Sequence, residues 1–186
     1  ARVACAQPEV AGALRRGQRA FFADGKILGV VRSPSFDAAE IEIVQAKEEG
    51  ERLRSGKGIN IPDTDLRLPA LSEKDLTDLD FVARHADLVG LSFANRPEDV
   101  RALQAELLAR TPEPPGILLK IETRVGFEHL PSLLFAALEG GPFGVMIARG
   151  DLAVELGYER MAEVQEEILW LCEAAHAPVV WATQVL

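Results

Sequence analysis

The sequence predicts an α/β protein in which a parallel sheet covered by helices follows a small β-rich unit. From residue 68 onward, short apolar segments alternate with amphipathic helical segments. Strands that are apolar throughout are typical of parallel sheets with helices packed on them. Before residue 63 the apolar segments are short, of strand type and separated by turn residues. We therefore expect a β-rich unit over residues 1–62 and a unit of βα repeats over residues 63–186.

The first unit is expected to be a small antiparallel sheet. Strand-type segments occur at residues 20–22, 27–31 and 41–44. Asp24-Gly25 stands between the first two segments and favours a hairpin turn. Loops are expected at residues 32–35 and 50–58. Because a unit of this size buries little apolar surface, we expect it to pack on a larger body.

Helices and strands alternate in the second unit. A helix is expected to begin at Ser72, because Ser72 and Asp75 have the spacing of a capping box before an apolar periodic segment. Pro97 is expected to open another helix, which the prolines at positions 112, 114 and 115 end. The other expected elements are strands at residues 87–93, 116–121, 143–148 and 178–183 and helices at residues 127–138 and 161–175.

Four strands of this kind correspond to half of a closed (β/α)₈ barrel. Such a TIM barrel has eight strands and about 250 residues. We therefore expect a partial TIM (β/α)₈ barrel of about four βα units, a piece of a longer protein whose neighbouring strands lie outside this sequence. Trp170 and Trp181 are expected to pack between a helix and a strand of this unit.

The composition narrows the classes of function. The net charge is −9, which repels nucleic-acid phosphates and anionic lipid surfaces, so we expect neither nucleic acid nor membrane as a partner. No apolar segment has the length of a membrane span. Cys5 and Cys172 lie far apart and lack metal-ligand spacing, which favours free thiols and a cytoplasmic location.

Polar residues interrupt each apolar strand only at its carboxyl end. They are Ser92 after the first, Lys120 and Glu122 on the second, Arg149-Gly150-Asp151 after the third, and Thr183-Gln184 after the fourth. The carboxyl ends of parallel strands form one edge, where ligands bind in such folds. Lys120 and Glu122 are two positions apart, so both side chains point to the same side of their strand.

These residues have the chemistry of a divalent-metal site. Glu122 and Asp151 come from neighbouring strand ends, and two carboxylates with room for substrate oxygens and waters suit Mg²⁺ or Mn²⁺. Lys120 beside such an ion would stabilise negative charge on phosphoryl or enolate oxygens. Gly150 would let backbone N–H groups approach a carboxylate. Taken singly, a Lys-x-Glu pair is also common on solvent-exposed strands, and Arg-Gly-Asp is also common in turns.

Several strings in the sequence resemble the pyruvate kinase family. The most specific are residues 145–152 (VMIARGDL) and 182–186 (ATQVL), together with Lys120-Ile121-Glu122 followed by Gly126. Residues 22–25, 56–62 and 68–75 are similar to the end of the inserted lid domain of that family and its return to the barrel. Ser92-Phe93 and Asp99-Val100 fit the strand and helix that follow there. The resemblance covers nearly the whole sequence in order.

The resemblance implies a role for each of these positions. Lys120 would stabilise the phosphoryl group in transfer, and Glu122 and Asp151 would bind the essential divalent metal. Ala148, Arg149 and Gly150, with Asp151, would border the carboxylate of pyruvate or phosphoenolpyruvate, and Thr183 would lie near the substrate methylene carbon. The implied reaction moves the phosphoryl group of phosphoenolpyruvate to ADP and gives ATP and pyruvate, a step of glycolysis. A homo-oligomer is expected.

The sequence also departs from the family pattern. Thr123 stands where the family usually has Asn, Ala153 where it usually has Gly, and Asn95 where an Arg is usual. The early strand residues that bind phosphate and K⁺ in the family have no counterpart here. K⁺ and nucleotide binding are therefore not assigned to residues of this sequence.

Two alternatives remain open. A metal-dependent pyruvate-enolate lyase of the aldolase-type barrels would use the same Glu and Asp, although such enzymes lack a lid-like insertion. A catalytically incomplete pyruvate kinase paralogue would keep the fold and the metal residues without turnover. Nucleotide-independent retro-aldol cleavage distinguishes the first, and metal binding without phosphoryl transfer distinguishes the second.

Overall fold

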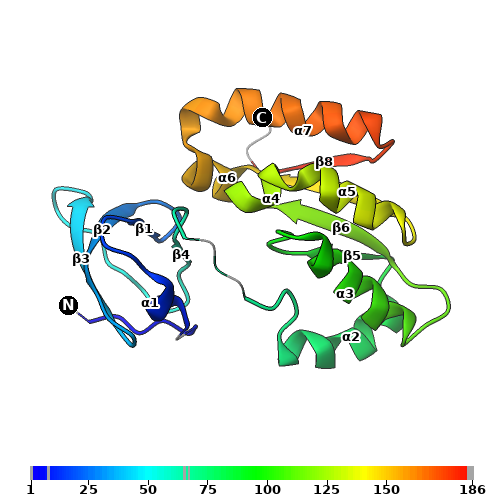
Figure 1. Ribbon diagram of the computed structural model, residues 1–186, viewed down its shortest axis with the longest axis horizontal. Coiled ribbons are helices and arrows are strands. Elements are labelled where there is room, and N and C mark those ends of the chain that lie inside the picture. Colours follow the sequence, from blue (N-terminus) through cyan, green and yellow to red (C-terminus); the bar gives the residue numbers. More distant parts are fainter. Residues whose placement is uncertain (1, 8, 65, 67, 184–186) are drawn as a thin grey trace. The chain divides into compact units, whose positions relative to one another are not determined.

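A computed structural model describes residues 2–7, 9–64, 66 and 68–183 of the chain. These residues divide into two compact units, Ala1–Arg67 and Leu68–Leu186 (Figure 1). Gln184 and the two residues after it, which belong to the last family-like string, lie outside the described residues. None of the described helices is long and apolar enough to cross a membrane.

The first unit contains a four-stranded antiparallel sheet in the order β3-β2-β1-β4. The elements are helix α1 (Glu9–Ala13) and strands β1 (Arg19–Phe22), β2 (Ile27–Pro34), β3 (Ala39–Gln45) and β4 (Ile59–Asn60). One side of the sheet packs on α1 through a cluster of Val10, Leu14, Val31 and Ile61. A second cluster joins Ala20, Phe22 and Ile27.

The expectation of a loop at residues 32–35 is wrong for its first three residues. β2 continues to Pro34, because Ser33 and Pro34 pair with Glu40 and Ala39 of β3 after a local shift of register. β1 pairs only with residues 27–30 of β2. Pro34 therefore lies at the end of the strand beyond β1, where the missing N–H of proline is tolerated.

The second unit is a four-stranded parallel sheet in the order β5-β6-β7-β8, which confirms the α/β class. The strands are β5 (Leu88–Leu91), β6 (Gly116–Ile121), β7 (Phe143–Ala148) and β8 (Val179–Ala182). The helices are α2 (Glu73–His85), α3 (Pro97–Leu108), α4 (Arg124–Glu128), α5 (Leu130–Leu138), α6 (Arg149–Leu156) and α7 (Met161–Ala174), with a 3-10 turn at Tyr158–Arg160.

Two predicted helix starts are confirmed. α2 begins after Ser72, whose hydroxyl accepts from Asp75 N at 3.2 Å while the Asp75 carboxylate accepts from Ser72 N at 2.8 Å. This is the reciprocal capping box that the sequence indicated. α3 begins at Pro97, whose missing N–H would have no partner in the first turn of a helix.

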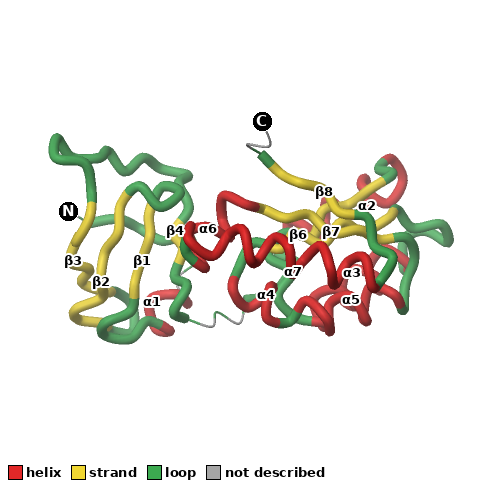
Figure 2. The backbone as a smooth tube through the Cα atoms, turned by 90° about the horizontal axis from the view of Figure 1, so that it is seen from above, coloured by secondary structure: helices red, strands yellow, loops and turns green. Residues whose placement is uncertain are grey.

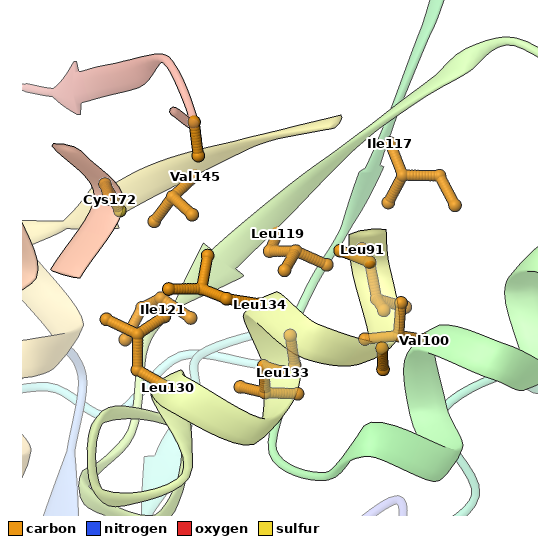
Figure 3. Packing of buried hydrophobic residues seen from close by; sticks show 14 of the residues in the cluster. Leu91, Val100, Ile117, Leu119, Ile121, Leu130, Leu133, Leu134, Val145 and Cys172 are labelled. Carbon is orange, nitrogen blue, oxygen red and sulfur yellow. The ribbon is translucent and has the colours of Figure 1, made fainter. Parts of the chain in front are cut away.

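The core of the second unit lies between the sheet and its helices, on one face of the sheet (Figure 2). Alternate strand residues such as Leu119, Ile121 and Ile147 are fully buried there. They pack against Val100 of α3, the leucines of α5, and Ile168 and Cys172 of α7. Figure 3 shows Leu91, Leu119 and Ile121 lying toward Leu130, Leu133 and Leu134. Because strand side chains alternate, Leu118, Lys120 and Glu122 point to the opposite face.

Two expectations about the second unit are wrong. Residues 127–138 do not form one helix, because α4 ends at Glu128 and α5 starts at Leu130. Pro131 explains the break, since its nitrogen cannot donate to a carbonyl of the preceding turn. Trp170 and Trp181 do not pack between helix and strand, because their side chains are 65 % and 42 % exposed.

Candidate active site at the carboxyl edge of the parallel sheet

The four parallel strands bring their carboxyl ends to one edge of the sheet. The register pairs Leu91 with Leu119, Ile121 with Ile147, and Ala148 with Ala182. The residues that follow β5, β6, β7 and β8 are therefore neighbours along this edge. Every polar site residue predicted from the sequence and described by the structure lies at or next to one of these ends.

Lys120 and Glu122 form a close ion pair on the face of the sheet opposite the helices. Lys120 Nζ lies 2.6 Å from Glu122 Oε1, and the two side chains are 28 % and 5 % exposed. Lys120 Nζ also donates to Ser92 Oγ at 2.9 Å. A carboxylate buried to this degree is stable as an anion only when positive charge or N–H groups compensate it.

The second oxygen of Glu122 is held by the backbone that follows β5. Phe93 N donates to Glu122 Oε2 at 2.8 Å. Phe93 adopts a φ of 52°, a left-handed conformation that bulky side chains rarely take. Both oxygens of the carboxylate therefore have a partner, and the orientation of Glu122 is fixed from two strands.

Thr123, directly after Glu122, ties the start of α4 to the segment after β5. Its hydroxyl accepts from Gly126 N at 3.0 Å, which makes it the N-cap of α4. The same hydroxyl donates to the side-chain oxygen of Asn95. His129 Nδ1 lies 2.8 Å from Asn95 O, so the imidazole carries a proton on Nδ1.

Arg149, Gly150 and Asp151 form the first turn of α6, immediately after Ala148 ends β7. Gly150 and Asp151 therefore lie inside α6, which begins at Arg149. Their backbone N–H groups belong to the first turn, where a helix leaves N–H groups without intrahelical partners. A Cβ at Gly150 would meet no atom within 4 Å, so the turn is open to an approaching group.

Arg149 connects the ends of β7 and β8. Its Nη1 donates to Thr183 O at 3.1 Å, and its guanidinium carbon lies 5.8 Å from the ring centroid of Trp181. Thr183 is exposed and has a φ of 56°, which is unusual for a β-branched residue. Phe93 and Thr183 thus both have a positive φ at this edge, and Thr183 is the residue expected near the substrate methylene carbon.

Glu155 is a buried acid in this region to which the sequence reasoning gave no role. It is 7 % exposed and lies one helical turn after Asp151. Its Oε2 is 3.5 Å from Arg124 N, at the start of α4, and Arg124 Nη2 donates to Glu155 O at 3.4 Å. The signal in the sequence was an acid inside the otherwise apolar segment that follows Asp151.

Carboxylate oxygens such as those of Glu122 and Asp151 are the ligand type that hard divalent cations prefer. No group of three or more His, Cys, Asp or Glu side chains with metal-ligand geometry occurs among the residues that the structure describes. Glu122 is a buried carboxylate at the strand edge, and Asp151 stands in the first turn of the helix from the next strand. Mg²⁺ commonly uses one or two carboxylates and fills its other positions with waters and substrate oxygens.

Comparisons with known proteins identify relatives of the chain. Residues 2–186 match the family described as pyruvate kinase, barrel domain. The chain is 37 % identical over 157 residues to a pyruvate kinase of Hypocrea jecorina, covering 82 % of this chain and 28 % of that protein. It is 35 % identical over 182 residues to pyruvate kinase PKLR of Homo sapiens, covering 96 % and 30 %. It is 33 % identical over 186 residues to a pyruvate kinase of Methylorubrum extorquens, covering 100 % and 36 %. The chain thus spans about a third of the length of these relatives.

Proposed function

The chain belongs to the pyruvate kinase family, and from that premise we propose that it is the catalytic barrel segment of a phosphotransferase that moves the phosphoryl group of phosphoenolpyruvate to ADP. The observation that carries the proposal is the contact between Lys120 and Glu122 at the carboxyl edge of the sheet. It places an ammonium and a buried carboxylate where ligands bind in parallel α/β folds.

In the proposed reaction Glu122 and Asp151 hold Mg²⁺ or Mn²⁺. When bound, the ion supplies positive charge beside the oxygens of the substrate. Without the ion, Phe93 N contacts one oxygen of Glu122 and Lys120 contacts the other. No residue of this chain is assigned to K⁺ or to the nucleotide.

Lys120 acts on the transferred group. Its ammonium stands at the carboxyl edge, where it faces negative charge that develops on phosphoryl oxygens as the bond to the enol oxygen breaks. Ser92, 2.9 Å from Lys120 Nζ, limits the directions in which this side chain extends. A fixed cation stabilises the transition state more than a mobile one, because little reorganisation is needed during the reaction.

The first turn of α6 and the end of β8 are proposed to hold the three-carbon acid. Arg149, Gly150 and Asp151, after Ala148, offer backbone N–H groups of a helix start to the substrate carboxylate. Arg149 donates to Thr183 O, which fixes the backbone of Thr183 next to this turn. Thr183 is then placed beside the substrate carbon that receives a proton when pyruvate forms.

The test measures phosphoryl transfer by the full-length protein with phosphoenolpyruvate, ADP and Mg²⁺. Lys120→Met is expected to lower kcat by about 10³-fold, as loss of a major electrostatic group does. Glu122→Gln is expected to abolish saturable Mn²⁺ binding as well as turnover. Lys74→Met and Glu166→Gln, which change exposed helix residues of the same unit, serve as matched controls.

Three outcomes would contradict the proposal. Full turnover in Lys120→Met would remove this lysine from the mechanism. Retro-aldol cleavage without nucleotide would identify a pyruvate-enolate lyase of the aldolase type. Mn²⁺ binding by wild-type protein that transfers no phosphoryl group would identify a catalytically incomplete paralogue.

A further inference from the structure

The segment after β5, residues 92–96, is fastened to the end of β6 and to α4 by hydrogen bonds beyond that of Ser92 with Lys120. Phe93 N donates to Glu122 Oε2 at 2.8 Å. Asn95 accepts from the Thr123 hydroxyl through its side chain and lies 2.8 Å from His129 Nδ1 through its backbone oxygen. The first contact reaches the proposed metal ligand itself, and the other two lie within the next few residues along the segment.

Asn95 is also held from its own side. Its backbone N–H donates to Asp99 Oδ2 at 3.1 Å, and the N–H of Arg96 donates to the same oxygen at 2.8 Å. The Asn95 side chain is therefore attached to a backbone that is fixed at the start of α3. A group that bonds to this side chain is therefore held in a fixed position relative to α3.

The Thr123 hydroxyl uses both of its hydrogen-bonding functions. It accepts from Gly126 N at 3.0 Å and donates to Asn95, 28 residues away in the chain. A hydroxyl has one donor and two acceptor sites, so both bonds form at once. One side chain thus connects the N-terminus of α4 with the segment after β5.

The connection matters because the Phe93 backbone is strained. A bulky residue at a φ of 52° persists only where its surroundings hold it, since the left-handed region is unfavourable without glycine. The Phe93 side chain is 51 % exposed, so core packing supplies little of that restraint. Ala94, the next residue, is buried in the core, and the bonds of Phe93 N to Glu122 and of Asn95 to Thr123 hold the backbone at Phe93 and two residues beyond it.

We propose that Asn95 and Thr123 are positioning residues that hold the Phe93 amide against Glu122 and so fix the orientation of this carboxylate for a divalent cation; the proposal rests on the proposed function of Glu122 as a metal ligand. Neither residue is proposed as a ligand of the ion. The structure shows that the two residues contact each other.

The experiment uses the full-length protein and measures three quantities for each variant. These are the dissociation constant of Mn²⁺ alone by electron paramagnetic resonance, the hydrogen-exchange rate of the Phe93 amide, and the melting temperature. Thr123→Val removes the hydroxyl but keeps the shape, and Asn95→Ala removes the acceptor. Thr123→Ser restores the hydroxyl, and Thr77→Val removes a hydroxyl bond from α2 as a matched control.

Thr123→Val and Asn95→Ala are each expected to weaken Mn²⁺ binding about tenfold and to speed Phe93 exchange by at least about tenfold. This is the effect of losing the bond from Phe93 N to the charged Glu122 carboxylate. Thr123→Ser and Thr77→Val are expected to keep the wild-type values of both. The double variant should be no worse than either single variant, because the two residues form one link.

A lower melting temperature in Thr123→Val with unchanged Mn²⁺ affinity and Phe93 exchange would overturn the proposal and leave Thr123 as a helix cap only. If Thr123→Val does not fold, the Mn²⁺ affinity and the Phe93 exchange rate of Asn95→Ala test the proposal, because this variant removes the other partner of the same bond. If the wild-type protein binds no Mn²⁺, the proposed function fails, and the exchange rate of Phe93 alone decides whether the two residues position this amide.

Discussion

At the scale of single residues, the Lys120 side chain lies between Glu122 and Ser92 at the carboxyl edge. Its ammonium is 2.6 Å from Glu122 Oε1 and 2.9 Å from Ser92 Oγ. A divalent cation that binds Glu122 at this oxygen meets the ammonium already there. Two positive charges at such a distance repel each other, so metal binding and the present position of Lys120 compete.

This competition predicts opposite changes in two measured constants. Lys120→Met should tighten Mn²⁺ binding to the free protein by about tenfold, or ~1.4 kcal/mol, because the competing ammonium is gone. The same variant should lose turnover. Titration with Mn²⁺ in the absence of substrate measures the first effect. Weaker metal binding in Lys120→Met would show that the lysine supports Glu122 rather than competing for it.

Cys172 provides a second prediction at this scale. Burial against the sheet raises the pKa of the Cys172 thiol to about 11, because an apolar environment disfavours the thiolate. At pH 8 its thiolate fraction is then about a hundredfold or more below that of an ordinary cysteine. Iodoacetamide should modify exposed Cys5 and spare Cys172 until denaturant is added, as peptide mass spectrometry would show. Equal rates at the two residues in native protein would contradict the burial of Cys172.

The sequence predicted that Lys120 and Glu122 lie together, because the side-chain direction along a strand depends only on the spacing of the residues. Lys120 and Glu122 are two positions apart on a strand, so their shared side followed from the pleat. The left-handed conformation of Phe93 and the bond between Asn95 and Thr123 were not predictable. Both depend on backbone segments that meet only in the folded chain. The Trp181 side chain, expected to be packed, is partly exposed beside Arg149.

At the scale of elements, α4 is packed directly against the segment after β5. A Cβ at Gly126 would lie 2.6 Å from Ala94 O, closer than such atoms approach. The segment after β5 approaches α4 this closely because residue 126 has no side chain. This close approach brings Thr123 within reach of Asn95.

Gly126→Ala is accordingly expected to push the segment after β5 away from α4. The destabilisation should be about 1–3 kcal/mol, the usual cost of a forced backbone shift, and Mn²⁺ affinity should fall with it. Gly141→Ala is the matched control, because a Cβ there would meet no atom within 4 Å. Urea unfolding of the full-length protein measures the difference. Equal stability of the two variants would contradict the tight packing.

The positions of most elements were predictable because apolar periodicity and caps are local signals. Ser72 and Pro97 marked the starts of α2 and α3 correctly. The break before α5 was missed although Pro131 is visible in the sequence, because the apolar pattern continues across it. The extension of β2 to Pro34 was missed because pairing with β3 overrides the turn preference of residues 32–34.

At the scale of the whole molecule, helices α3, α5 and α7 pack on one face of the parallel sheet (Figure 2). On the opposite face, Leu88 is 66 % exposed and Val180 is 42 % exposed. Among the described strands, β5 and β8 each have one neighbour. Exposed apolar strands with unpaired edges tend to associate with other chains.

The 186-residue chain by itself is therefore expected to bind the dye ANS and to sediment as a mixture of associated species. The relatives are about three times longer than this chain. A full-length protein of that length should bind less dye and associate less. Fluorescence titration and analytical ultracentrifugation of both proteins make the comparison. If the 186-residue chain is monomeric and does not raise ANS fluorescence, the prediction that this face is exposed and associates is wrong.

The stacking of Arg149 on Trp181 gives the molecule an optical reporter of its own. Indole emission responds to a cation over the ring, and this cation belongs to the first turn of α6, where substrate is proposed to bind. Trp170 is 65 % exposed on α7, and its emission is expected to stay nearly constant during such a titration. A difference spectrum recorded during a titration would therefore follow events at this corner of the sheet without any label attached.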